Sequence, residues 1–143
     1  MFWHGSPRIF SSFSLADSGR LTGASNGALG VWCGFDGDRH LAARFAGKDG
    51  ALYGIEEVDG PVYPMTVKEL AKLHDEAGDL PDIDAEVAFY DELRRDLIGR
   101  GFARIDIIEK DGEASMCIIL DPERAVIVER VLMAPEEVAE PTP

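Results

Sequence analysis

Hydrophobic positions along the chain follow two different spacings, which separate predicted strands from predicted helices. Short hydrophobic runs bounded by glycine, proline or aspartate predict strands. These runs span residues 1–4, 29–35, 51–58, 103–110, 115–121 and 125–133. Residues 60–65 contain two prolines and are predicted to be extended. An Asp-Gly pair at 111–112, between two alternating runs, predicts a β-hairpin.

Hydrophobic residues that share a helix face predict helices at residues 38–46 and 84–99, and a capping box predicts a third at residues 66–74. Asp38 is expected to cap the first helix, and Thr66 begins a Thr-x-x-Glu capping box at the second. Strands lead the order of elements, with helices inserted in the first two-thirds of the chain. This order predicts an α+β fold with a mostly antiparallel or mixed sheet.

Two segments lack a regular hydrophobic pattern. Residues 5–29 are rich in serine and glycine and predict a long loop with at most one helical turn, which in a compact domain is typically functional or disordered. Residues 134–143 are rich in proline and glutamate and predict a disordered acidic tail. The length of 143 residues fits one domain, which we place at residues 1–133.

Composition narrows the classes of partner and the compartment. The chain carries 27 Asp and Glu against 14 Lys and Arg, a net charge of -13, which argues against broad binding to nucleic-acid phosphates. No apolar run approaches the ~20 residues of a membrane span, and the N-terminal residues do not have the pattern of a signal peptide. A cytoplasmic location away from membranes is therefore expected. Cys33 and Cys117 lie in hydrophobic, strand-like segments and are expected to be reduced core thiols.

Four segments hold residues that could together form a ligand site. They are His4-Gly5-Ser6 in "WHGSPRIFSSF", Trp32 in "GVWCGF", Phe45 in "AARFA", and the closing "CIILDPERAVIV". With "LIGRGFARIDII" and in this order, they resemble the ADP-ribosyltransferase fold of the diphtheria-toxin and poly(ADP-ribose) polymerase type. The similarity covers residues 1–130 and is greatest to the small versions in phage and mobile-element polyvalent proteins. It implies an α+β fold with a mixed or antiparallel split sheet and a few helices.

The resemblance implies NAD as a substrate and gives the candidate residues roles. His4 would hydrogen-bond a ribose hydroxyl, and Gly5 would offer its backbone N–H and C=O to the nicotinamide amide. Trp32 and Phe45 stand where the family has tyrosines and would present flat apolar faces to the ring. The resemblance also places Ser6 among the NAD-binding residues. The implied activity is that of an NAD-dependent mono-ADP-ribosyltransferase, a glycosyltransferase, or an NAD glycohydrolase.

Plainer explanations exist for the same residues. His4 could be a hydrogen-bonded core histidine, Trp32 and Phe45 could be ordinary core, and Gly5 could serve a turn. The histidines and cysteines match no zinc-binding spacing, so no metal site is predicted.

The resemblance also implies a catalytic glutamate near the end of the domain. Such transferases commonly carry a glutamate five residues before the aspartate of the closing strand, and counting back from Asp121 gives Met116. The neighbouring Ser115 could offer a hydroxyl but no charge. Glu113 is the candidate catalytic glutamate, provided that a bulge in the strand brings it to the site.

Two other functions remain open: a degenerate relative that binds NAD or ADP-ribose without turnover, and a protein-interaction domain. For a transferase the sequence does not identify the acceptor, although the negative charge favours a protein over a nucleic acid. It does not predict an oligomeric state.

Overall fold

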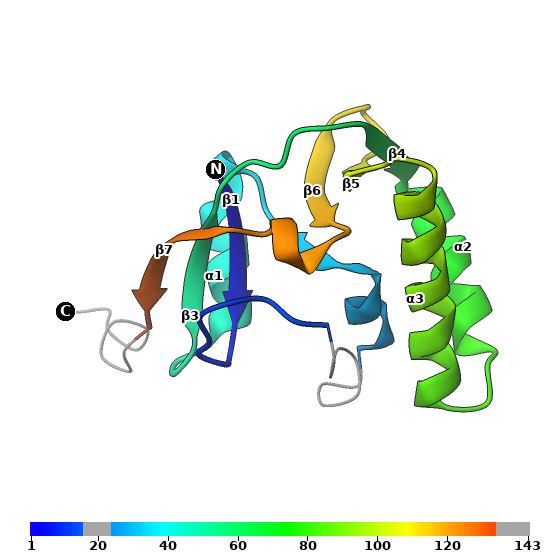
Figure 1. The fold of residues 1–143 in the computed structure, drawn as a ribbon, viewed down its shortest axis with the longest axis horizontal. Coiled ribbons are helices and arrows are strands. Elements are labelled where there is room, and N and C mark those ends of the chain that lie inside the picture. Colours follow the sequence, from blue (N-terminus) through cyan, green and yellow to red (C-terminus); the bar gives the residue numbers. More distant parts are fainter. Residues whose placement is uncertain (16–23, 134–143) are drawn as a thin grey trace.

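The computed structural model describes residues 1–15 and 24–133, and their strands form two sheets (Figure 1). The first sheet has the order β1-β3-β7 and is antiparallel throughout. It contains β1 (Phe2–Ser6), β3 (Ala51–Ile55) and β7 (Ile127–Leu132). The second sheet has the order β2-β6-β5-β4, with only β4 and β5 parallel. It contains β2 (Val31–Cys33), β4 (Val62–Thr66), β5 (Arg104–Ile108) and β6 (Ala114–Ile119).

Three helices cover the outer faces of these sheets. They are α1 (Arg39–Ala46), α2 (Val67–Gly78) and α3 (Ile83–Gly99). Helix α1 lies behind β1 and β3, whereas α2 and α3 lie side by side at the opposite end of the molecule (Figure 1). Three short 3-10 turns, η1 (Ser25–Leu29), η2 (Asp36–Asp38) and η3 (Pro122–Arg124), complete the elements of the described chain.

The predicted α+β class and the predicted hairpin are confirmed. Strands β5 and β6 pair antiparallel across residues 109–113, and Gly112 at φ +88° takes the left-handed backbone that the turn needs. The sheet is mixed because α2 and α3 lie between β4 and β5 and form the crossover that a parallel pair requires.

The helix ends show where local signals were accurate and where they were not. The Thr66 hydroxyl accepts the backbone N–H of Glu69 at 3.1 Å, as the capping box predicts. Helix α2 continues to Gly78, beyond the predicted end at residue 74. The predicted cap at Asp38 is wrong, because η2 gives Asp38 a backbone (φ -112°, ψ 24°) outside the extended region, and its carboxylate makes no capping hydrogen bond.

The hydrophobic core has three layers that alternate with the sheets. The first lies between α1 and the β1-β3-β7 sheet and includes Trp3 and Leu52. The second lies between the two sheets and includes Tyr53 and Cys117. The third lies between the second sheet and helices α2 and α3 and includes Tyr90. Successive residues of β3 point into different layers, so all five of its residues are buried.

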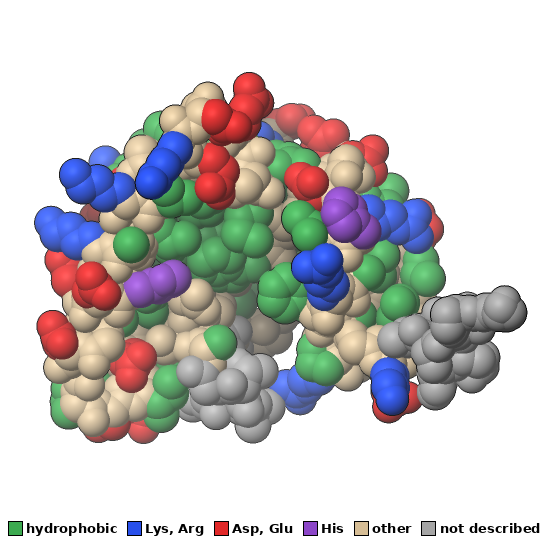
Figure 2. All heavy atoms as spheres, turned by 180° about the vertical axis from the view of Figure 1, so that it is seen from behind, with side chains coloured by type: hydrophobic (Ala, Val, Ile, Leu, Met, Phe, Trp, Pro, Cys, Tyr) green, Lys and Arg blue, Asp and Glu red, His purple; other side chains and the backbone are tan. Residues whose placement is uncertain are grey.

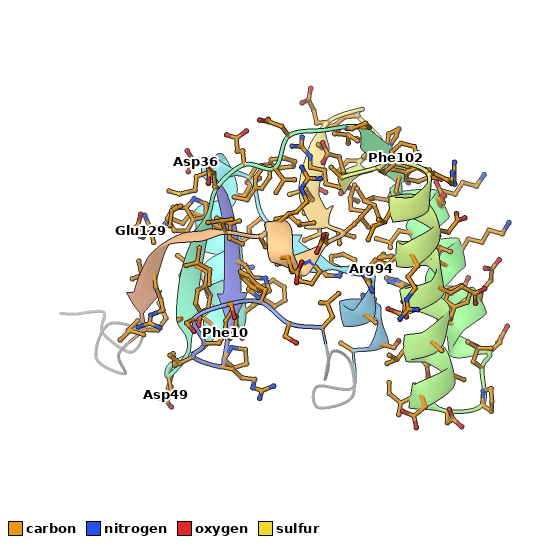
Figure 3. All side chains as sticks on the ribbon, viewed as in Figure 1. Phe10, Asp36, Asp49, Arg94, Phe102 and Glu129 are labelled. Atoms are coloured by element: carbon orange, nitrogen blue, oxygen red, sulfur yellow. The ribbon has the colours of Figure 1, made fainter. Side chains whose placement is uncertain are left out.

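A side chain from α3 links the helical end to the sheets. Arg94 points from α3 toward the segment after β6 (Figure 3), where it donates to the Leu120 carbonyl at 3.4 Å. Asp91, one helical turn earlier, holds the same guanidinium at 2.8 Å. This pairing fixes the start of the connection that leads to β7.

Cys33 and Cys117 are free and buried, as expected. They are direct partners in the β2–β6 register. A hydrogen bond to Cys117 and burial together raise the pKa of the Cys33 thiol well above its usual value. Both side chains therefore belong to the core.

The predicted loop at 5–29 contains η1, the one helical turn that was allowed for, but its residues 16–23 lie outside the described residues, as does the predicted tail at 134–143. None of the helices in the described ranges has the length and apolar composition needed to cross a lipid bilayer.

Candidate functional site

A cavity of about 320 Å³ lies where the two sheets diverge. Within residues 1–15 and 24–133, a single isolated bridge between Trp3 and Gly34 joins β1 to the segment after β2. Residues of β1, η1, β2, α1 and β6 line the cavity. A second hollow of about 620 Å³ adjoins it along the segment after β1. On the face opposite to that of Figure 1, hydrophobic side chains gather in a central hollow below a group of acidic ones (Figure 2).

Both spaces are lined by the four residues that were predicted to contact the nicotinamide half of NAD. They are His4, Gly5, Trp32 and Phe45. They come from β1, β2 and α1; residues 7–30 separate β1 from β2, and residues 34–38 separate β2 from α1. The fold therefore brings this part of the predicted site together in one place.

His4 lines the cavity and is held by a hydrogen bond to β2. Its Nδ1 lies 2.6 Å from the Trp32 carbonyl oxygen. Because a carbonyl can only accept, Nδ1 carries the proton and donates, which leaves Nε2 as the atom available to a ligand. Burial lowers the pKa of His4, and the bond to Trp32 offsets this only in part. The imidazole is therefore neutral at neutral pH, with Nε2 as a hydrogen-bond acceptor.

Gly5 packs directly against the backbone of α1. A Cβ atom at this position would overlap the Ala42 carbonyl oxygen and lie 2.8 Å from its carbon and 3.1 Å from the Ala46 nitrogen. Glycine is therefore required for α1 to pack on β1, and the alternative that Gly5 merely serves a turn is wrong. Packing alone explains the residue, whether or not a ligand binds.

The backbone N–H and C=O of Gly5 have no hydrogen-bond partner among residues 1–15 and 24–133. Trp3 and Gly34 exchange two hydrogen bonds, of 2.9 and 2.7 Å, toward the β2 edge. Alternate residues of a strand present their N–H and C=O to the same edge, so those of Gly5 also face β2. In the part of the chain that the structure describes, β1 has no pairing on that edge beyond the Trp3 bridge. A donor and an acceptor of Gly5 thus face the gap between the sheets.

Ser6 serves the turn that follows β1. Its buried hydroxyl accepts the Arg8 backbone N–H at 3.1 Å, and the residue lines only the larger hollow. The next residues are fastened to β3 by Tyr53, whose hydroxyl donates to the Arg8 carbonyl and accepts the Phe10 N–H. The Phe10 ring (Figure 3) stacks on the Tyr53 ring, with 4.4 Å between the ring centroids. These contacts hold the start of the loop over the His4 side of the site.

The two aromatic candidates differ in burial. Trp32 is half-buried, packs against the core layer beneath α3 and donates its indole N–H to the Asn26 carbonyl at 3.0 Å. Phe45 is 66% exposed, which excludes an ordinary core role for it. Phe45 lies on α1 and lines both spaces with an apolar ring. Exposure of this ring to water is unfavourable, so a ligand that covers it would gain free energy.

Strand β6 forms another wall and contains a β-bulge. Ile107 pairs with Met116 but Ile108 pairs with Ala114, so Ser115 is the extra residue. Ser115 and Met116 would point to opposite faces of a regular strand, yet both line the cavity. Glu113, in the hairpin turn just before β6, is exposed and does not line the cavity. The bulge exists, but it brings in Ser115 and leaves the predicted catalytic glutamate outside.

Other lining residues were not foreseen in the sequence. Asp38, released from the expected capping role, lines the smaller cavity and is the single carboxylate among its described lining residues. Leu41, one turn before Phe45, adds to the apolar rim. The helical spacing of Asp38, Leu41 and Phe45 was visible in the sequence, but it does not show which face of the helix meets a cavity. No three His, Cys, Asp or Glu side chains of residues 1–15 and 24–133 are placed to hold a metal ion.

Comparison with protein-family models, with curated proteins and with solved structures finds no match to this chain.

Proposed function

We propose that the chain binds NAD in the cavity between its sheets and acts as an NAD-dependent mono-ADP-ribosyltransferase or NAD glycohydrolase. One observation carries the proposal: His4 and Gly5 of β1, Trp32 of β2 and Phe45 of α1 line the same cavity. The resemblance of their sequence motifs to ADP-ribosyltransferases is the reason for choosing NAD. The two-sheet arrangement is compatible with that fold.

The chemistry of the lining suits the nicotinamide half of NAD. A carboxamide has one donor and one acceptor end, and the Gly5 backbone N–H and C=O, which face the β2 edge, match that pair. Trp32 and Phe45 provide apolar ring faces for the nicotinamide. His4 Nε2 accepts a hydrogen bond from a ribose hydroxyl, because the Trp32 carbonyl fixes the other nitrogen as the donor. The Asp38 carboxylate lines the same space and favours a cationic ring.

In this proposal the protein positions the substrate for cleavage of one bond. The C–N bond between ribose and nicotinamide breaks, and nicotinamide leaves with the bonding electrons as a neutral molecule. An oxygen of water or of an acceptor then bonds to the ribose carbon and releases its proton. Holding the amide and a ribose hydroxyl at fixed points orients the carbon toward the incoming oxygen.

Thermal denaturation with and without NAD tests the proposal. At 100 times Kd, a ligand stabilises the folded state by about 2.7 kcal/mol, which raises the midpoint by several degrees. Nicotinamide release, followed chromatographically, reports turnover, and His4→Ala is expected to abolish it. His40→Ala is the matched control, since His40 is an exposed residue of α1 that lines neither space. No midpoint shift at millimolar NAD would contradict the proposal and favour a protein-interaction domain.

A second candidate is a domain that binds NAD or ADP-ribose without turnover. The observation in its favour is that Met116 lines the cavity where a carboxylate is expected, while Glu113 lies outside. A midpoint shift with NAD but no nicotinamide release by the wild-type protein would decide for this candidate.

A further inference from the structure

The β-bulge in β6 creates a polar pair at the wall of the cavity that neither the motifs nor the proposed function uses. Ser115, the bulged residue, lines the cavity, and its hydroxyl lies 2.6 Å from Oε2 of Glu109. Glu109 follows β5 and is exposed, so its carboxylate is in contact with water on one side and with Ser115 on the other. A single residue therefore connects the cavity to a carboxylate outside it.

The hydrogen bond sets the role of the serine. A carboxylate can only accept, so the single Ser115 proton is donated to Glu109. The lone pairs of Oγ then remain for a group in the cavity, and the adjacent negative charge strengthens Oγ as an acceptor. Ser115 in this state favours a ligand hydroxyl or N–H over a ligand carbonyl.

The hairpin holds Glu109 in this position. Its backbone N–H donates to the Glu113 carbonyl at 2.9 Å, and its carbonyl accepts the Gly112 N–H at 2.9 Å. Asp111 also accepts the Glu113 N–H at 2.9 Å and stiffens the turn. The backbone of Glu109 is thus fixed on both sides.

We propose that Ser115 is the residue that recognises a sugar hydroxyl of the ligand from the β6 side of the cavity, and that Glu109 is its positioning residue. The inference rests on the proposed function in that the ligand is NAD and the hydroxyl belongs to its nicotinamide ribose. In this inference the ribose hydroxyl is recognised by Ser115 with support from the Glu109 carboxylate. Glu113 and Met116 have no part in that recognition.

Two NAD analogues, each lacking one hydroxyl of the nicotinamide ribose, test this pair by isothermal titration calorimetry. The wild-type protein is expected to bind one of them about tenfold or more weakly than NAD, the scale of a hydrogen bond to a charge-assisted acceptor. Ser115→Ala and Glu109→Gln should reduce this discrimination to within about twofold, because the interaction partner or its charge is gone. Ser115→Thr, which keeps a hydroxyl, should retain it.

Glu113→Gln is the matched control, since it removes an exposed carboxylate from the same hairpin without touching the cavity. Its discrimination should equal that of the wild type. Equal discrimination in Glu109→Gln and Glu113→Gln, with NAD still bound, would overturn the role of Glu109 and leave the proposed function intact. Loss of discrimination in Ser115→Thr together with Ser115→Ala would overturn the hydroxyl's role. Absence of NAD binding by the wild type would instead refute the proposed function itself.

Discussion

Replacing Gly5 with alanine should separate α1 from β1 and destabilise the protein. The new Cβ would overlap the Ala42 carbonyl oxygen and lie 2.8 Å from its carbon. An ordinary contact between carbon atoms is about 3.5–4.0 Å, so the helix must move by roughly 1 Å. The obstructing atoms are backbone atoms, and no side-chain rotation can relieve the overlap.

The size of the loss follows from what α1 covers. Trp3 and Leu52 are 2% and 3% exposed beneath the helix, and large apolar side chains contribute about 1.5–3 kcal/mol each when buried. A gap of 0.5–1 Å forfeits about a quarter to a half of the contact energy. We therefore expect a loss of about 1–3 kcal/mol, which agrees with the usual cost of overpacking.

Urea denaturation followed by far-UV circular dichroism measures this loss. With a slope of about 1–3 kcal/mol per molar, the midpoint should fall by roughly 1 M. Gly37→Ala is the control, because a Cβ at Gly37 would meet nothing within 4 Å and its backbone is not in the positive-φ region. That variant should stay within about 0.5 kcal/mol of the wild type. Equal midpoints for the Gly5→Ala variant and the wild type would refute the explanation of Gly5 by helix packing.

Three further changes have distinct expected outcomes. Tyr53→Phe removes the two hydrogen bonds that the hydroxyl makes with Arg8 and Phe10. We expect the free energy of unfolding, measured with urea, to fall by about 1–2 kcal/mol and hydrogen exchange of residues 7–15 to become faster. Unchanged exchange would show that the hydroxyl does not hold this segment. Because burial lowers the pKa of His4 below the ~6.5 of the unfolded chain, the unfolded state binds more protons below that pH. Its contribution to stability is therefore complete above about pH 6.5 and is lost as the pH falls through the lowered pKa. His4→Gln should flatten this part of the stability–pH curve relative to His40→Gln, and parallel curves for the two variants would contradict the assignment. Thr66→Ala should cost about 1 kcal/mol by loss of the cap on α2, which thermal denaturation would detect, and no change would mean that the cap is replaced by water.

Signals carried by adjacent residues determined much of the fold in advance. Hydrophobic patterning predicted most helices and strands to within a few positions, two prolines predicted the extended segment that forms β4, and Asp111-Gly112 predicted the β5–β6 hairpin. Thr66 and Glu69 predicted the start of α2 for the same reason, since a cap involves only neighbouring groups of one chain segment. The resemblance of the sequence motifs also grouped His4, Gly5, Trp32 and Phe45 as a set.

Other features of the site follow only from tertiary structure, because they depend on contacts between segments that are far apart in the chain. The packing of α1 on β1 explains Gly5 better than any local turn, and η2 removes Asp38 from the helix cap and gives its carboxylate to the cavity. The bulge opposite Ile108 turns Ser115 into the cavity and leaves Glu113 outside. A bulge is a property of the register between two strands, and one shifted residue reverses which side chains face a site. Hydrophobic periodicity within one strand contains no record of that register, so the position of the carboxylate could be determined only from the folded chain.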